Sequence, residues 1–214
     1  TSAGRRVSLI KAFKKSLVLL QSESKIFITD LDTKRSPAAY FADESFNIGY
    51  FKESNYIDEL LNICRKNQVS IVIPTLDTEL IQLAKVKSLF KANGIQVIIS
   101  DLNLIEILRD KIRTNTFFNS LMIQTPIIYT KNNLKFPVFL KPLNGSNSAG
   151  IYRADNLKEI KQSDLESGNM MILENIDHTI YDEYTVDLYF NKNSVLKCAV
   201  PRIRLKVVGG ESNQ

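Results

Sequence analysis

The chain has 214 residues, which is enough for one large domain or two small ones. Its hydrophobic fraction of 44% is ordinary for a soluble globular protein, no apolar run is long enough to cross a bilayer, and the start shows no signal-peptide pattern. We therefore expect a cytoplasmic protein without a membrane partner. The net charge is +5, but the basic residues are scattered among acids, which argues against a nucleic-acid partner.

Both ends of the sequence suggest that the chain is incomplete. The first residues, TSAGRRVSLIKAF, form a turn that runs into a helix, and such a turn normally follows a strand. The last residues, RLKVVGGESNQ, stop after a predicted strand. Cys64 and Cys198 are too isolated to indicate a disulfide framework or a metal knuckle.

Helices and strands alternate through the first hundred residues. Apolar residues at helical spacing predict helices that begin near residues 7, 55 and 77, and the last is expected to have Asp77 or Thr78 as its cap and to end at Gly94. Short apolar runs predict strands at residues 25–30, 69–74 and 95–100. This order indicates a parallel sheet with helices on both faces, whose ligand edge would carry the segments TSAGRR, TDLD and PTLD.

The pattern changes after residue 101. Two helical segments, 102–109 and 111–121, lead into a region where strands dominate, with one helical stretch near residues 156–161. The predicted strands are FPVFLKP, MMILENI, EYTVDLYF, SVLKCAVP and RLKVV. This is an α+β pattern with antiparallel strands, so we expect a second domain to begin at residue 102.

The stretch FPVFLKPLNGSNSAGIY contains the strongest functional signal. Gly145 and Gly150 allow backbone N–H groups to converge on one point, and Ser146 and Ser148 add hydroxyl donors, an arrangement suited to phosphate oxygens. On its own, the loop would favour an ordinary hairpin over a phosphate site. Lys141 favours the functional interpretation, because an ammonium group in an apolar strand is costly to bury without an anion.

Other candidate residues are less distinctive. Lys111 alone would be a helix-surface lysine, while Glu174 and Glu183 lie at predicted strand ends, where a carboxylate can bind ribose hydroxyls. Two arginine pairs could bind carboxylates or phosphates, or form salt bridges with nearby acids, and both interpretations remain open. These pairs are Arg5 with Arg6, and Arg202 with Arg204. The only histidine, His178, lies in a polar loop and is not expected to act as a base.

Taken together, these segments resemble the ATP-grasp superfamily. The matching segments occur in the order Asp110-Lys111, FPVFLKP, GSNSAGI, ILEN and DEYTVD, and the first half of the chain resembles short proteins related to the large subunit of carbamoyl phosphate synthase. The resemblance covers essentially the whole chain. It implies an α/β protein with a Rossmann-like pre-ATP-grasp domain (1–101), a first ATP-grasp lobe (102–183) and an incomplete second lobe (184–214).

The resemblance also implies residue roles. Lys111 and Lys141 would contact ATP phosphates, and the loop that includes Gly145, Ser146, Ser148 and Gly150 would close over them. Glu174, Asn175 and Ile176 would meet adenine, largely through their backbone, and Glu183 would bind ribose. Arg5, Arg6, Arg202 and Arg204 are the weaker candidates for substrate binding. No catalytic residue is assigned.

The implied activity is that of an ATP-dependent carboxylate–amine ligase that works through an acylphosphate intermediate. Its expected partners are ATP and a small carboxylate or bicarbonate-like substrate, and a homo-oligomer is left open. Members of the superfamily place their Mg²⁺ ligands beyond the segment that matches EYTVD, so we expect no metal ligand within this chain and expect the ligands beyond residue 214.

Two alternatives remain at this point. The first is a non-catalytic or split nucleotide-binding subunit. The second is a dinucleotide-binding oxidoreductase, suggested by the alternating first half, but TSAGRR is not a G-x-G-x-x-G fingerprint and the sequence contains no other.

Overall fold

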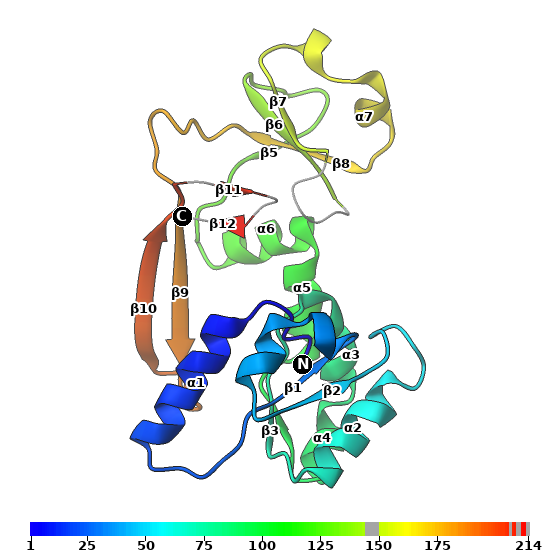
Figure 1. Cartoon of the computed structure of the whole chain (residues 1–214). Helices are drawn as coiled ribbons and strands as arrows, with labels where there is room; N and C mark the ends of the chain where they lie inside the picture. The colour runs from blue at the N-terminus through cyan, green and yellow to red at the C-terminus, as the bar shows by residue number, and fades with distance from the viewer. Residues whose placement is uncertain (144–149, 206, 209–210, 213–214) are drawn as a thin grey trace. The chain divides into compact units, whose positions relative to one another are not determined.

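The computed structural model describes residues 1–143, 150–205, 207–208 and 211–212. The chain divides into two compact units, Thr1–Arg109 and Asp110–Gln214. Figure 1 shows the elements of each unit. The sequence analysis placed the boundary at residue 102, whereas the first unit of the structure also contains the helix Leu102–Arg109.

The first unit alternates helices and strands in the predicted manner. Its strands are β1 (Phe27–Asp30), β2 (Glu44–Asn47), β3 (Ile71–Val72) and β4 (Gln96–Val97). Its helices are α1 (Val7–Leu19), α2 (Tyr56–Lys66), α3 (Leu80–Lys85), α4 (Lys87–Ala92) and α5 (Leu102–Arg109), with 3₁₀ turns at Thr33–Arg35, Pro37–Phe41 and Asp77–Glu79.

The strands of the first unit form two parallel pairs, β1 with β2 and β3 with β4. The N-terminal residues lie between these pairs. The backbone N–H of Ala3 donates to Thr29 O at 3.2 Å, and the nitrogen of Thr1 donates to Ile73 O at 2.8 Å. Residues 1–3 therefore connect the pairs in the way a further strand would.

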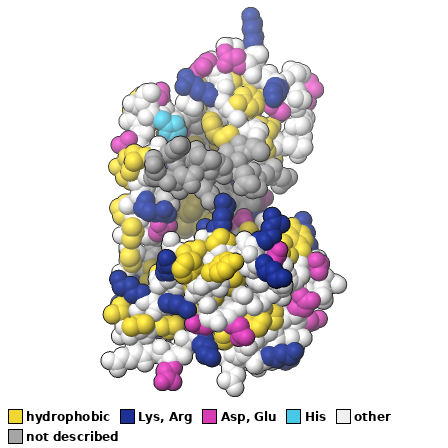
Figure 2. All heavy atoms as spheres, in the orientation of Figure 1, with side chains coloured by type: hydrophobic (Ala, Val, Ile, Leu, Met, Phe, Trp, Pro, Cys, Tyr) yellow, Lys and Arg dark blue, Asp and Glu magenta, His cyan; other side chains and the backbone are white. Residues whose placement is uncertain are grey.

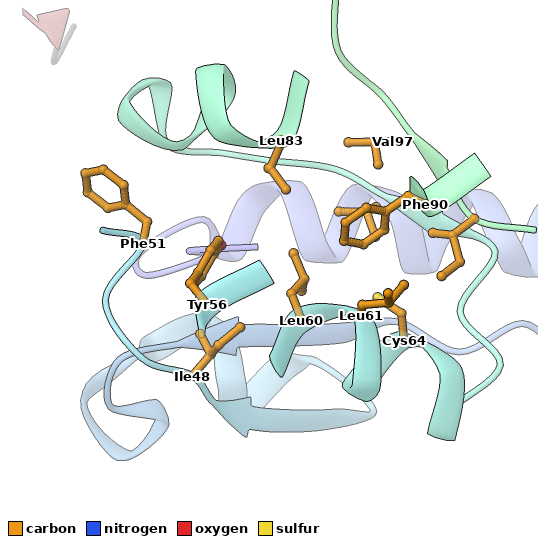
Figure 3. Packing of buried hydrophobic residues seen from close by; sticks show 11 residues of the cluster. Ile48, Phe51, Tyr56, Leu60, Leu61, Cys64, Leu83, Phe90 and Val97 are labelled. Carbon is orange, nitrogen blue, oxygen red and sulfur yellow. The ribbon is translucent and has the colours of Figure 1, made fainter. Parts of the chain in front are cut away.

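The larger core cluster of the first unit combines side chains of α2, α3, α4, β3 and β4. Tyr56, Leu60, Leu61 and Cys64 follow helical spacing along one side of α2 and are buried against side chains that include Phe90. Figure 3 shows these residues converging between the helices and β4. The 3.6-residue period therefore predicted the correct buried face of α2.

The second unit is built around an antiparallel sheet with the order β5-β8-β6-β7. The strands of this sheet are β5 (Ile128–Tyr129), β6 (Val138–Pro142), β7 (Tyr152–Ala154) and β8 (Met170–Glu174), and the helices of the unit are α6 (Lys111–Ser120) and α7 (Gln162–Glu166), with a 3₁₀ turn at Leu157–Glu159. The buried side chains of Val138, Leu140, Ala154, Ile160 and Ile172 form its core.

A separate hairpin follows the antiparallel sheet in the sequence. β9 (Tyr184–Phe190) pairs with β10 (Leu196–Ile203), and a further short pair joins β11 (Val207–Val208) to β12 (Glu211–Ser212). Tyr184, Val186 and Leu188 lie on one face of β9, and each is more than half exposed. Thr185 and Asp187 lie on the opposite face, which is more polar.

The predicted fold class is confirmed: a parallel α/β first part precedes an antiparallel α+β part. Two details differ from the prediction. The predicted helix over residues 77–94 is divided at Val86 into α3 and α4. It starts with a 3₁₀ turn whose N-cap residue is Leu76, so the prediction that Asp77 or Thr78 caps it was wrong. The strands β2, β5, β7 and β12 were not predicted.

Two surface properties bear on the expected partners. None of the helices in the described part of the chain is long and apolar enough to span a membrane. On the face shown in Figure 2, lysine and arginine side chains are dispersed among acidic and apolar side chains.

Candidate functional site

Lys141 projects from the sheet of the second unit. On β6 the side chains of Val138 and Leu140 are fully buried on one face, and Phe139 and Lys141 lie on the other. The Lys141 side chain is half-buried. Loss of solvent lowers its pKa below the ordinary value for a lysine, and the nearby charge of Lys111 lowers it further. Both effects disfavour the charged form, so an anion at this position would be stabilising.

Lys111 reaches the same region from α6. It is the first residue of this helix, directly after Asp110, whose side chain accepts hydrogen bonds of 2.9 Å from the backbone N–H groups of Ile112 and Arg113. The Lys111 ammonium donates to the carbonyl oxygen of Pro142, the residue after Lys141. The ammonium groups of Lys111 and Lys141 thus both lie near the end of β6. In the described part of the chain, neither forms a salt bridge with a carboxylate.

In the sequence, the glycine-rich segment follows directly after β6 and Leu143. Gly145, Ser146 and Ser148 fall in residues 144–149, outside the described residues. Gly150 is described and has a φ of +74°, which favours glycine. A Cβ at this position would lie 3.2 Å from Cγ of Pro142, so a side chain here would also crowd the end of β6.

The residues predicted to contact adenine lie at the end of the sheet opposite to Lys141. Glu174 ends β8 opposite Val138, three residue pairs from the Lys141–Met171 pair, which is about 10 Å along the strand. The Glu174 carboxylate accepts a 3.2 Å hydrogen bond from the backbone N–H of Ile127. Asn175 and Ile176 follow in an irregular segment, where Ile176 is 43% exposed. This spacing is compatible with a nucleotide extended along the sheet, and the adenine contacts stay a prediction.

Glu183, Arg202 and Arg204 all take part in salt bridges in this structure. Arg204 Nη1 donates to Glu183 Oε1 at 2.7 Å, and Arg202 Nε donates to Asp187 Oδ2, also at 2.7 Å. The salt-bridge interpretation therefore describes these arginines as they stand. A ribose contact by Glu183 would require the Arg204 pair to rearrange, and the roles of these three residues stay predictions.

The first arginine pair lies at the predicted edge of the parallel strands. Arg5 and Arg6 are exposed and directly precede α1. Two hydrogen bonds to the backbone of Gly4 fix the preceding turn. The N–H of Gly4 donates to Asp30 Oδ2 at 2.8 Å, and the hydroxyl of Ser36 donates to Gly4 O at 2.9 Å. The Asp30 carboxylate therefore takes the N–H that a phosphate would need at this turn, which further disfavours a dinucleotide site.

Glu79 was missed by the sequence analysis. Its side chain is 0% exposed, although the sequence places it among polar residues at a helix start. Its carboxylate accepts hydrogen bonds from the hydroxyls of Tyr56 (2.6 Å), Thr1 (2.7 Å) and Ser2 (3.3 Å). Glu79 thus joins the first turn of α2 to the turn that carries Arg5. No local sequence signal marks it, because its partners are distant in the sequence.

The described residues do not include a group of three or more histidine, cysteine, aspartate or glutamate side chains placed to hold a metal ion. Within the described part of the chain there is thus no group that would hold Mg²⁺, and Mg²⁺ stays a prediction for this chain.

Comparisons with known proteins agree with this architecture. Residues 1–98 match the family described as the PylC-like, N-terminal domain. A carbamoyl-phosphate synthase of Methanobrevibacter smithii is 27% identical over 139 residues, which cover 60% of this chain and 35% of that protein. The chain thus spans about a third of the length of this curated relative.

Solved structures resemble the chain over most of its length. The biotin carboxylase of Campylobacter jejuni, in a β-γ-ATP complex, gives a TM-score of 0.67 at 14% identity and covers 95% of this chain and 50% of that chain. The N5-carboxyaminoimidazole synthetase of Staphylococcus aureus, complexed with ADP, gives 0.63 at 15% identity and covers 90% and 50%. These structures share the predicted fold, and the family match over residues 1–98 together with the carbamoyl-phosphate synthase relative confirms the predicted resemblance.

Proposed function

We propose that this chain provides the ATP-binding part of an ATP-dependent carboxylate–amine ligase. The observation that carries the proposal is the meeting of Lys111 and Lys141 at the end of β6, directly before the glycine-rich turn. Burial and the nearby charge of Lys111 both lower the pKa of Lys141, so the two ammonium groups are poorly stable as neighbours in the free protein. A polyphosphate between them would remove the repulsion and replace part of the lost hydration.

The proposed reaction begins with transfer of the γ-phosphoryl group of ATP to a carboxylate oxygen of the substrate. ADP leaves, and the product is a mixed acylphosphate. An amine then attacks the acyl carbon, inorganic phosphate leaves with the C–O bond electrons, and the amine loses a proton as the C–N bond forms. Phosphoryl transfer depends mainly on positioning and on stabilisation of charge, which lysines can supply.

This chain's own residues would contribute in three places. Lys111 and Lys141 would hold phosphate oxygens, and the turn that ends at Gly150 would approach the phosphates closely because no Cβ intervenes there. The backbone beyond Glu174 would receive the adenine. Mg²⁺ would add charge neutralisation when bound, but its ligands are not among the residues described. Arg5 and Arg6 are the exposed candidates for an anionic acceptor.

The relatives support this proposal through the ligands that their names record. The biotin carboxylase was solved with a β-γ-ATP ligand and the synthetase with ADP, and the sequence relative is a carbamoyl-phosphate synthase. The acceptor carboxylate, or a bicarbonate-like substitute, is part of the proposal and rests on these likenesses.

Calorimetric titration of ATP and ADP into the full chain, with and without Mg²⁺, tests nucleotide binding. Lys141→Ala is expected to weaken ATP binding by about 10-fold or more, because a hydrogen bond to a charged group contributes about 1.5–3 kcal/mol. Lys158→Ala, which removes an exposed lysine from the same unit, is the matched control and should bind as the parent does. A folded chain that binds neither nucleotide at millimolar concentration would refute the proposal.

Turnover is tested separately. ADP formation is measured with bicarbonate and with a panel of amino acids, and hydroxylamine is added to trap an acylphosphate as a hydroxamate. Carboxylate-dependent ADP release with hydroxamate formation supports the ligase. Nucleotide binding without any turnover would instead favour the non-catalytic or split subunit and contradict the proposed reaction.

A further inference from the structure

The first unit contains a pocket that the proposed ATP chemistry does not use. Its volume is about 490 Å³, within the range of small-molecule sites. It lies where β1 and β2 end, next to Leu31 and Asn47, and α2 forms its other wall. The carboxyl ends of parallel strands are the usual place for ligands in sheets of this kind.

The helical wall of the pocket follows from the spacing of residues in α2. Glu59, Asn62, Ile63 and Lys66 are separated by three, four and seven positions, so they form one stripe along the helix. The buried face of the same helix, which includes Leu60 and Cys64, packs into the core. One side of α2 therefore faces the core, and a different side faces the pocket.

Several hydrogen-bond donors in the pocket are available for a ligand. Within the described part of the chain, Asn62 and Lys66 make no side-chain hydrogen bond or ion pair. Asn47 uses its side-chain oxygen to accept from the backbone N–H and the hydroxyl of Thr33, each at 2.9 Å, which leaves its amide nitrogen to donate. The pocket thus offers a cation and neutral donors.

The acidic groups near the pocket are already engaged. Glu59 accepts hydrogen bonds from the backbone N–H of Gly49 (3.0 Å) and from the side chain of Asn55 (2.8 Å). A Cβ on Gly49 would lie 2.6 Å from Glu53 Oε2, so glycine allows both carboxylates to approach this backbone. Since Glu59 and Lys66 are about 10 Å apart along α2, the positive end of the pocket lies away from these acids.

Apolar side chains complete the pocket. Leu31 is 60% exposed directly after β1, while Ile48 is only 7% exposed and lies deeper. Ile63 lies between the polar positions of α2. A ligand that matches this surface has a compact apolar body for Leu31 and Ile63 and an anionic group for Lys66 and Asn62.

We propose that this pocket binds a small organic carboxylate with an apolar body, at a site separate from the lysine pair of the second unit. Nothing in this inference depends on the proposed ligase reaction. Free enzyme and nucleotide-bound enzyme would both carry the site, because all of its lining residues belong to the first unit.

The test uses three probes that share a phenylpropyl body: 3-phenylpropionate, 3-phenylpropionamide and 3-phenylpropylamine. Each is titrated into the ¹⁵N-labelled full chain, and amide shifts are followed by NMR. We expect the carboxylate to bind about fivefold more tightly than the neutral amide, as for a partly exposed charge pair, and the amine to bind most weakly. The largest shifts should occur at Gly49, Asn62 and Lys66.

Lys66→Gln is expected to reduce the carboxylate affinity to that of the neutral amide. Lys91→Gln is the matched control, because Lys91 is also an exposed lysine in the last turn of a helix of the first unit but does not line the pocket. The spectra themselves report that each variant is folded. Equal affinities for carboxylate and amine, unchanged binding by Lys66→Gln, shifts centred elsewhere, or no binding at millimolar concentration would each overturn the proposal.

Discussion

The hydroxyl of Tyr56 donates a 2.6 Å hydrogen bond to the carboxylate of Glu79, and the two side chains are 1% and 0% exposed. Tyr56 opens α2 and Glu79 precedes α3, so this bond joins two helices beneath the turn formed by residues 1–4. A carboxylate this deeply buried depends on its hydrogen bonds, because removing any donor leaves lone pairs that water cannot reach.

Replacement of Tyr56 by phenylalanine should therefore destabilise the first unit by about 1–3 kcal/mol, the usual cost of an unsatisfied buried polar group. Urea unfolding followed by circular dichroism measures this difference. Tyr40→Phe removes the hydroxyl of a tyrosine that is 80% exposed and should change stability little. Equal effects of the two substitutions would show that the Tyr56–Glu79 bond contributes little.

The same bond predicts a sensitivity to alkaline pH. Burial raises the pKa of Tyr56 above its ordinary value, and the Glu79 charge raises it further. The unfolded chain therefore loses this proton first, at a pH of about 10. The stabilisation by Tyr56 is complete below that pH and is lost above it, by up to about 1.4 kcal/mol per pH unit.

Unfolding of the parent and of Tyr56→Phe between neutral and alkaline pH measures this loss. The stability difference between the two proteins should shrink as the pH rises above 10. A difference that stays constant over this range would contradict the raised pKa.

Lys141→Met should separate the nucleotide role of Lys141 from its structural role. Without nucleotide, the unfolding free energy should stay the same or rise slightly, because a half-buried ammonium group with a lowered pKa is replaced by an apolar chain of similar length. With ATP present, the variant should gain less in Tm than the parent does. Thermal unfolding with and without ATP gives both quantities.

Lys158→Met provides the exposed control for this experiment and should match the parent in both conditions. A loss of more than about 1 kcal/mol by Lys141→Met in the absence of nucleotide would show that the lysine holds the fold rather than a ligand.

Gly150→Ala and Gly168→Ala form a matched pair. Both glycines have positive φ, +74° and +64°, so alanine strains the backbone by about 1 kcal/mol at either position. Only at Gly150 would the new Cβ meet another residue, Pro142, and Gly168 has open space. We expect Gly150→Ala to lose somewhat more stability than Gly168→Ala, because only its Cβ crowds Pro142, and only Gly150→Ala to weaken ATP binding, as measured by calorimetry. If the two variants bound ATP with equal affinity, Gly150 would not be part of the phosphate site.

Periodic patterns predicted much of the fold. The apolar side of α2 was evident because Leu60, Leu61 and Cys64 recur at helical spacing, and β6 was evident as an apolar run. β2 was missed because Glu44–Asn47 is short and contains only one apolar residue, Phe46. The division between α3 and α4 at Val86 was missed because the apolar period continues through it and neither glycine nor proline marks the break.

The candidate site was predictable only in part. Lys111 and Lys141 were placed at one site only through a family resemblance. They are thirty positions apart, and no local sequence pattern indicates that they lie close together. The polar role of Glu79 could not be predicted, because its donors Thr1 and Tyr56 are brought to it by tertiary packing. The pairing of Glu183 with Arg204 likewise depends on the register of the β9–β10 hairpin.

The bond between Asp30 and the Gly4 N–H has an evolutionary consequence. The backbone N–H of Gly4, in the turn before α1, is bonded to an internal carboxylate, so this amide does not bind an external phosphate while Asp30 is present. Removal of that carboxylate by a single substitution would release a preformed anion-binding amide at the edge of a parallel sheet. A fold of this kind could thus gain affinity for a phosphorylated ligand through the loss of one side chain, without any change in the course of its backbone.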